Sequence, residues 1–367
     1  MSLRALSGKH ADPRKGRGAG VNPEGRFENV EREAYDDGWQ TGAEAEPTVL
    51  KTLVTDERAK SIIARNESPD IPFSQSLNPY QGCEHGCIYC YARPSHAYRN
   101  LSPGIDSETR IFAKVNAPEL LRKELSKPGY QCELIALGAN TDPYQPAERE
   151  RRITRGILEV CAEFNQPVGI VTKNALVERD LDILGPMAAK GLAEVFVSVT
   201  TLDHELARRM EPRCTAPTRR LQAVRALTDA GVPAGVMVAP VIPFLNDHEV
   251  EAIIEAAAEH GAQRAGYVLL RLPYEVKTLF RDWLMRHYPL KAEHVMSRVH
   301  AMRGGRDNDP QFGSRMTGAG EFAALLKQRF SVACKKAGLN QARRGEGVRR
   351  NTALFCVPGA VKQGNLF

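Results

Sequence analysis

Between residues 111 and 273 the chain alternates strand-like apolar runs with helix-like amphipathic runs at short intervals. The predicted strands are Cys132–Leu137, Val168–Val171, Ala193–Val199, Ala234–Pro240 and Ala265–Leu270. The predicted helices are Pro118–Ser126, Glu148–Phe164, Leu181–Lys190, Arg219–Ala230 and Asp247–His260. With one more strand before Cys83, the pattern gives six βα units, which is typical of a parallel sheet or barrel. Polar groups follow the strands, at the edge where barrel enzymes carry their chemistry. The predicted fold class is therefore α/β, a partial (β/α)6 barrel.

The pattern changes on both sides of this barrel, which we place at residues 51–275. Residues 1–50 are small, charged and without an apolar stripe, so we expect a disordered N-terminal tail. Residues 276–367 form a C-terminal extension in which Val276–His287 and Glu321–Ala337 are predicted helices and Thr352–Val357 a short strand. The loop Gly304–Arg315, rich in Arg, Gly and Asp, is expected to cover the barrel mouth or to contact phosphate.

Composition limits the class of protein. The chain has 367 residues, 42% of them apolar, but nowhere the stretch of about 18 apolar residues that would span a membrane. No signal-peptide core follows Met1, so we expect a cytoplasmic protein with reduced cysteines.

The charge is distributed unevenly. The whole chain carries a formal +6, whereas residues 281–367 contain 16 Lys/Arg against 6 Asp/Glu, a net +10, which leaves −4 for residues 1–280. This split indicates a basic extension on a near-neutral core, either a polyanion-binding region or a solvated basic surface. Phosphate contacts would come from Arg343, Arg344, Arg349 and Arg350.

Three cysteines stand close together in the run Cys83-Glu-His-Gly-Cys87-Ile-Tyr-Cys90. Three thiolates can bind three irons of a [4Fe-4S] cluster and leave the fourth iron open, whereas electron-transfer clusters normally take four cysteines. A zinc site with His85 or His96 as fourth ligand is the main alternative. A disulfide framework is disfavoured, because eight cysteines in a chain of this length are not a dense scaffold.

An ordered series of motifs from about Asn78 to about Pro240 resembles the radical S-adenosylmethionine proteins of the spore photoproduct lyase-like group. Beyond the cysteine loop, the series consists of Thr172-Lys173, Ser198, Glu211-Pro212, Arg220, Ala230–Pro233 and Val238–Pro240. The resemblance implies a radical enzyme with a [4Fe-4S] cluster on Cys83, Cys87 and Cys90 and with S-adenosylmethionine as cofactor.

The same resemblance implies roles for strand-end residues. Asn140, Thr141 and Asp142 correspond to the segment that contacts the methionine amino end of the cofactor. Lys173 would meet its carboxylate as a point charge, and Ser198 would bond the ribose or carboxylate. Simple turn chemistry at Asp142 and a solvated loop lysine at Lys173 are the alternatives.

One position departs from the family. In the lyase a cysteine of the second-strand segment donates the hydrogen atom that completes repair, and the matching residue here is Ala139, which cannot donate. Direct carry-over of lyase activity is therefore in doubt. Among the remaining cysteines, Cys214 is the candidate hydrogen donor, and a small buried apolar role is its alternative.

The last five residues, Gln363-Gly-Asn-Leu-Phe367, resemble the peptide by which bacterial repair proteins dock on the sliding clamp. Gln363 would be the polar contact, and Leu366 and Phe367 the apolar anchors. A frayed chain end is the alternative. The leading prediction is a radical enzyme, supplied by an electron donor, that acts on DNA or another nucleic acid in a repair-like reaction. A protein or small-molecule substrate, and a non-catalytic metal-stabilised nucleic-acid-binding module, remain alternatives.

Overall fold

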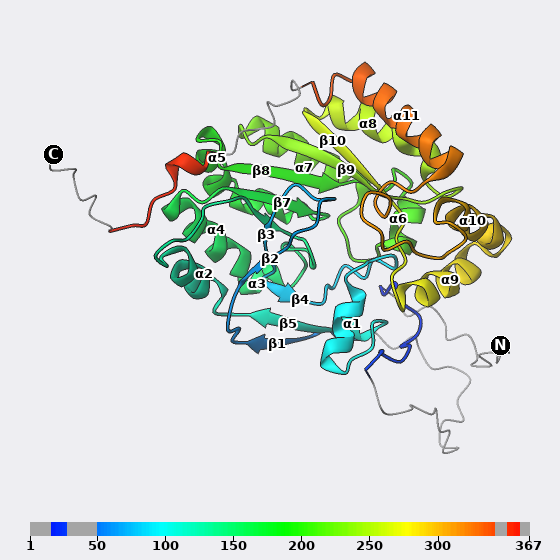
Figure 1. Cartoon of the computed structure of the whole chain (residues 1–367), viewed down its shortest axis with the longest axis horizontal. Helices are drawn as coiled ribbons and strands as arrows, with labels where there is room; N and C mark the ends of the chain where they lie inside the picture. Colours follow the sequence, from blue (N-terminus) through cyan, green and yellow to red (C-terminus); the bar gives the residue numbers. More distant parts are fainter. Residues whose placement is uncertain (1–15, 28–49, 342–350, 360–367) are drawn as a thin grey trace, which may run out of the picture.

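The computed structural model describes residues 16–27, 50–341 and 351–359, and a seven-stranded sheet runs through its centre (Figure 1). The strand order is β10-β9-β8-β7-β6-β3-β2. All neighbours pair in parallel except β2, which is antiparallel to β3. The strands are β2 Ile63–Arg65, β3 Gln75–Leu77, β6 Ile135–Leu137, β7 Val168–Thr172, β8 Ala193–Ser198, β9 Ala234–Val241 and β10 Arg264–Leu269. The six parallel strands confirm the predicted α/β partial barrel.

Helices between these strands cover the outer face of the sheet (Figure 1). They are α2 Ala117–Leu125, α4 Ile153–Phe164, α5 Leu181–Ala189, α7 Pro217–Asp229 and α8 Val250–Glu259, with the shorter α1 Asp106–Thr109, α3 Glu148–Arg151 and α6 His204–Met210. Single 3₁₀ segments are η1 Arg93–Arg99, η2 Ala175–Asp180 and η3 Asp247–Glu249. Strand residues such as Val195 and Val197 are fully buried, as expected of parallel strands covered on both faces.

A second, three-stranded sheet in the order β1-β5-β4 was not predicted. Its strands are β1 Leu53–Glu57, β4 Tyr80–Gln81 and β5 Arg110–Lys114. β1 and β5 pair in parallel, and β4 is antiparallel to β5. Because β4 ends two residues before Cys83, this small sheet fixes the point at which the cysteine loop begins.

The C-terminal region confirms part of the prediction. α9 spans Val276–His287 as expected, and α11 spans Gly320–Lys336, whereas α10 Pro289–Met302 was not predicted. The predicted strand over 352–357 is wrong, because this segment starts with the 3₁₀ turn η4 Thr352–Leu354. No strand of the described chain pairs with it, and Phe355 packs against Tyr130 and Phe164 instead.

The prediction of a disordered tail is wrong for residues 16–27, which pack on the barrel. Arg17 and Ala19 are buried there. We call residues 16–27 the N-terminal strap. The arginines predicted to contact phosphate, Arg343, Arg344, Arg349 and Arg350, and the peptide residues Gln363, Leu366 and Phe367 lie outside the described residues.

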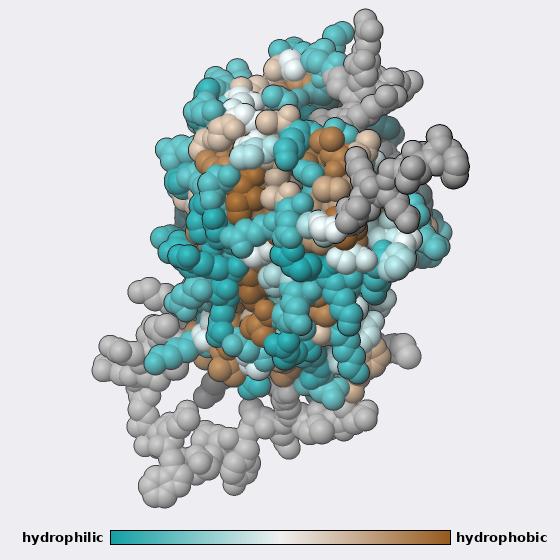
Figure 2. All heavy atoms as spheres, turned by 90° about the vertical axis from the view of Figure 1, so that its left-hand side faces the viewer, coloured by the Kyte–Doolittle hydropathy of each residue, from teal (hydrophilic) through white to brown (hydrophobic). Residues whose placement is uncertain are grey.

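Polar side chains dominate the face drawn in Figure 2, and the apolar ones there form separate patches between them. Among the described residues, no helix is both long and apolar enough to cross a bilayer. The carboxyl ends of the parallel strands, where barrel enzymes carry their functional residues, point towards α9 and α10 in Figure 1.

Candidate active site

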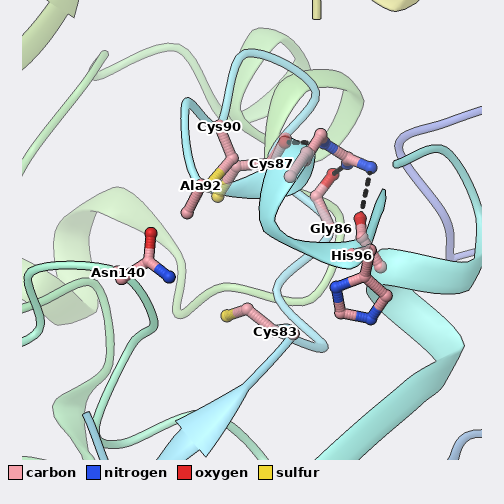
Figure 3. Close-up of a pocket in the computed structure, with 10 residues that line it drawn as sticks. Cys83, Gly86, Cys87, Cys90, Ala92, His96 and Asn140 are labelled. Carbon is pink, nitrogen blue, oxygen red and sulfur yellow. Dashed lines mark hydrogen bonds between the residues drawn. The ribbon is translucent and has the colours of Figure 1, made fainter. Parts of the chain in front are cut away.

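The three motif cysteines lie on the loop that follows β4. The amide of Cys83 donates to Ser107 O (3.0 Å) and that of Cys90 to Cys87 O (3.1 Å). Gly86 has φ +66°, and a Cβ there would lie 2.7 Å from Glu108 Oε2, so only glycine fits this close approach. In Figure 3 the cysteines border one opening, with Asn140 at its rim. The loop thus gathers three thiols that the sequence separates.

A buried ion pair holds the loop from behind. Arg93 Nε donates to Cys87 O (2.9 Å) and Nη2 to Gly86 O (3.0 Å). The same guanidinium meets Glu108 at 2.5 Å, and both side chains are nearly inaccessible. Charge-assisted bonds of this kind are the stronger ones in proteins, so this ion pair fixes the loop backbone at the opening, which Arg93 itself helps to line.

The N-terminal strap also binds the Glu108 carboxylate. The amides of Gly18 and Ala19 donate to Glu108 Oε2 and Oε1 (3.0 and 2.8 Å). Arg17 Nη1 donates to Glu108 O (2.9 Å). A Cβ on Gly18 would lie 1.9 Å from Gly86 O, so the strap lies directly on the cysteine loop.

Cys214 lies against the loop as well. Its Sγ is 3.7 Å from Cys87 Sγ, and this hydrogen bond, against the effect of burial, lowers the pKa of Cys87 to about 7. Burial raises the pKa of Cys90 to about 11. Cys214 borders a separate surface cavity between α6 and α7 and does not line the central one. Its position therefore fits contact with the cysteine loop and does not support the predicted role of hydrogen donor.

Lys173 and Ser198 stand at the ends of β7 and β8, where they line the central cavity. Burial alone would lower the pKa of Lys173, but the charges of Cys87 and Glu211 raise it. Glu211 is buried and ion-paired with Arg220, whose Nη1 also donates to Ser198 O (3.0 Å). A charged network below the cavity floor thus keeps Lys173 cationic and fixes the end of β8.

The segment 140–142 divides into two environments. Asn140 is exposed beside the cysteines. Thr141 Oγ1 donates to Gly82 O (2.7 Å), and Asp142 accepts from Lys173 N (2.8 Å) and lies 3.3 Å from His85 Nδ1. Burial alone would raise the pKa of Asp142, but His85 and these hydrogen bonds lower it to about 2. Thr141 and Asp142 therefore connect elements of the scaffold, whereas Asn140 is free to meet a ligand.

The cavity at the barrel mouth has a volume of about 510 Å³. Its wall includes Cys87 and Cys90 of the cysteine loop, Arg271 after β10, and Arg315 from the loop that precedes α11. Ala139 also borders it, which places the position of the family's hydrogen-donating cysteine in the wall. The loop Gly304–Arg315 was expected to cover the mouth, and its last residue does line the cavity.

Of the two histidines considered as zinc ligands, His85 has both ring nitrogens engaged, because Nδ1 lies 3.3 Å from Asp142 Oδ2 and Nε2 lies 3.2 Å from Asn174 Nδ2. His96 Nε2 bonds Arg110 O (2.9 Å), whereas its Nδ1 is buried without a partner among the described residues, and His96 lines the cysteine opening. In the described part of the chain, no three His, Cys, Asp or Glu side chains are grouped to hold one metal ion. Thiolates that each bind a different iron of a cluster need no such grouping.

A parallel partial barrel with a three-cysteine loop opening on a cavity at the strand ends defines a radical S-adenosylmethionine enzyme. The model of the Radical SAM superfamily matches residues 77–257, and the chain belongs to this superfamily. The family's cofactors, a [4Fe-4S] cluster and S-adenosylmethionine, are therefore those of this enzyme.

The chain is also similar to an uncharacterized protein and, in fold, to solved structures. The uncharacterized protein Rv2578c of Mycobacterium tuberculosis is 37% identical over 231 residues, 62% of this chain and 68% of that protein. A cysteine-to-serine mutant of spore photoproduct lyase has a TM-score of 0.57 at 15% identity, over 81% of this chain and 85% of that one. A mutant with bound AdoMet and dinucleoside spore photoproduct gives 0.55 at 15% identity, over the same two shares. At this identity the likeness shows the fold.

Sequence reasoning missed the residues that hold the loop in place. Arg93 and Glu108 carry a weak signal, because a buried ion pair has no periodicity. The strap was missed because it has no apolar stripe: its contacts come from two backbone amides and from the side chains of Arg17, Asn22 and Arg26. Gly18, which lies on the cysteine loop, was the available clue.

Proposed function

We propose that this cytoplasmic enzyme holds its [4Fe-4S] cluster on Cys83, Cys87 and Cys90 and uses S-adenosylmethionine for radical chemistry on nucleic acid. The observation that carries the proposal is the opening of the three-cysteine loop onto a cavity that strand-end polar residues line. When bound, the cluster and its ligand supply a 5′-deoxyadenosyl radical that abstracts hydrogen. The chain's own residues bind and orient the cofactor and the substrate and shield them from water.

We assign three residues to the cofactor. Lys173, cationic and at the cavity wall, would bind the carboxylate, and Ser198 would offer a hydroxyl beside it. Asn140, beside the cysteines, would meet the amino end. Thr141 and Asp142 act as positioning residues, because their polar atoms already bond Gly82 and the start of the segment after β7.

The substrate class has independent support. A spore photoproduct lyase mutant with the same fold contains a dinucleoside lesion, and the cavity wall here carries cations without any Asp or Glu among its described residues. Ala139 stands in the wall where the lyase has its hydrogen-donating cysteine, and alanine cannot donate the hydrogen atom that completes the lyase reaction. We therefore propose a nucleic-acid reaction that differs from photoproduct repair in its last step.

Anaerobic reconstitution tests the proposal. The loaded enzyme, with reductant and S-adenosylmethionine, should form 5′-deoxyadenosine, and added DNA or RNA should increase the amount. Cys83→Ala is the matched control and should form none. Bound zinc and no 5′-deoxyadenosine would favour the binding-module alternative. Product formation that nucleic acid leaves unchanged would favour a protein or small-molecule substrate.

Two partners complete the proposal, an electron donor and the sliding clamp. A peptide ending in Gln-Gly-Asn-Leu-Phe should bind the host's clamp at about 100 μM, which corresponds to roughly −5 to −6 kcal/mol. Replacement of Leu366 and Phe367 by Ala should remove this binding. If the unchanged peptide does not bind, the clamp is not a partner.

A further inference from the structure

We propose that Arg271 and Arg315 form an anion site at the mouth of the central cavity that binds a backbone phosphate of a single-stranded nucleic-acid segment. The inference rests on the proposed function and narrows its substrate class. It concerns two lining residues of the cavity that we have not assigned to the cofactor.

The two arginines reach the cavity from adjoining segments. Arg271 follows β10 directly, and Arg315 ends the loop that covers it. The loop is tied to the strand end by the Leu269 amide, which donates to Met316 O (2.9 Å). Arg303 Nη2 donates to Leu270 O (2.9 Å) in the same place. The position of Arg315 relative to Arg271 is therefore fixed by backbone contacts.

Arg271 is half-buried and meets no carboxylate within hydrogen-bond distance in the described part of the chain. Its Nε is buried and makes no hydrogen bond there. Its Nη1 contacts the thioether of Met316 at 3.6 Å, a weak acceptor. By contrast, the buried guanidiniums of Arg93 and Arg220 each meet a carboxylate. A buried donor without an acceptor is costly, and a ligand anion would relieve this cost at Nε.

Arg315 is held so that part of its guanidinium stays available. Its Nε bonds Asp70, and its Nη2 donates to Ser68 Oγ (2.6 Å). Its Nη1 meets no acceptor among the described residues. A planar guanidinium fixed in this way offers directed donors to phosphate oxygens.

The site is separate from the cofactor's cation. Lys173 follows β7, and β8 and β9 lie between that strand and β10. Lys173 also faces the negative charges of Glu211 and Cys87, whereas burial and the charge of Arg315 lower the pKa of Arg271. Asp70 already pairs with Arg315, but an anion beside Lys173 would leave Arg271 without a partner, and a second anion, carried by the substrate, would supply it.

Aromatic rings beside both arginines point to nucleic acid. Arg271 lies 5.5 Å from the ring centre of Tyr91, and Arg315 4.5 Å from that of Phe312. Tyr91 is 48% exposed and Phe312 61% exposed. Exposed rings next to cations are the arrangement by which proteins stack bases and bind the phosphates between them. Tyr91 lines the cavity whereas Phe312 does not, so the two rings extend from the cavity wall to the surface, as a strand that continues beyond the cavity would need.

The test measures binding of a labelled single-stranded oligonucleotide to the loaded enzyme with S-adenosylmethionine, under anaerobic conditions. Arg271→Gln and Arg315→Gln should each raise Kd about tenfold and reduce the slope of log Kd against log salt by about 0.7, the value for one phosphate contact on a single strand. Arg58→Gln, in an exposed ion pair with Glu119, is the matched control and should change neither. Iron content and cofactor affinity, which report folding, should stay at the wild-type values.

A second oligonucleotide of the same sequence, with neutral methylphosphonate linkages, measures how much of the affinity comes from the phosphate charges. Wild-type enzyme should bind it at least as weakly as Arg271→Gln binds the charged strand, and Arg271→Gln should bind the neutral strand no more weakly than wild type does. If the charged strand binds tightly but the arginine variants bind it equally well, the anion site is overturned while the proposed function stands. If wild-type enzyme binds no nucleic acid at low salt, the proposed substrate class fails first and the site with it.

Discussion

Cys214 Sγ lies 3.7 Å from Cys87 Sγ, although 127 positions separate the two residues in the sequence. The contact places a fourth thiol beside a loop whose own three cysteines are enough to hold the proposed cluster. It follows that the two cysteines, close as they are, should respond differently to substitution.

Replacing Cys87 by Ser should abolish the cluster, because each of the three loop cysteines is expected to bind one iron and none is spare. Cys214→Ser should keep about four irons per chain and the brown absorbance. Iron analysis after anaerobic reconstitution compares them. Equal loss of iron in both variants would show that Cys214 is itself a ligand.

Lys173→Ala and Ser198→Ala should weaken S-adenosylmethionine binding by about 1–3 kcal/mol without changing iron content, since each removes one polar partner of a buried ligand. Calorimetry on the loaded enzyme measures the change. Lys127→Ala, on an exposed lysine after α2, is the control. Unchanged affinity in both site variants would remove these residues from the cofactor pocket.

Glu108→Ala should destabilise the protein by about 3–5 kcal/mol, because it leaves the Arg93 guanidinium buried without its carboxylate. It also removes the acceptor of the Gly18 and Ala19 amides. Urea unfolding of the cluster-free chain gives the free energy. Glu119→Ala breaks an exposed pair instead and should cost less than about 1 kcal/mol. Similar costs for the two variants would contradict the anchoring role.

Asp142 should make the stability depend on pH in the acid range. Its pKa is lowered from 3.8 to about 2 in the folded chain, so folding favours the ionised form by about 2–3 kcal/mol. This contribution is fully present above the unfolded value and is lost as the pH falls from about 5 towards 2. Unfolding free energies of wild type and Asp142→Asn should converge over that window. A constant difference between them would refute the assignment.

The repetitive part of the fold could be predicted from the sequence, and the site scaffold could not. The six strands and the helix Val276–His287 follow from periodic apolar positions that any packing of the chain must bury. The strand expected at 352–357 is not formed, because β-propensity needs a neighbouring strand to pair with, and no described strand pairs with this segment. The loop cysteines could be found because spacing alone encodes them, whereas Arg271 became visible only once the barrel brought it into the same cavity wall as Lys173.

The strap has a consequence for the order in which the protein is made. Gly18 lies on the cysteine loop, whereas a Cβ on Gly20 would lie 2.5 Å from Arg286 Cζ, and Arg26 pairs with Glu275 at 3.0 Å. The ribosome therefore releases the strap first but supplies its last docking partners only when α9 emerges. The contacts of the strap with the cysteine loop need no residue beyond Glu108, so the strap can close the back of that loop long before its last partners are made.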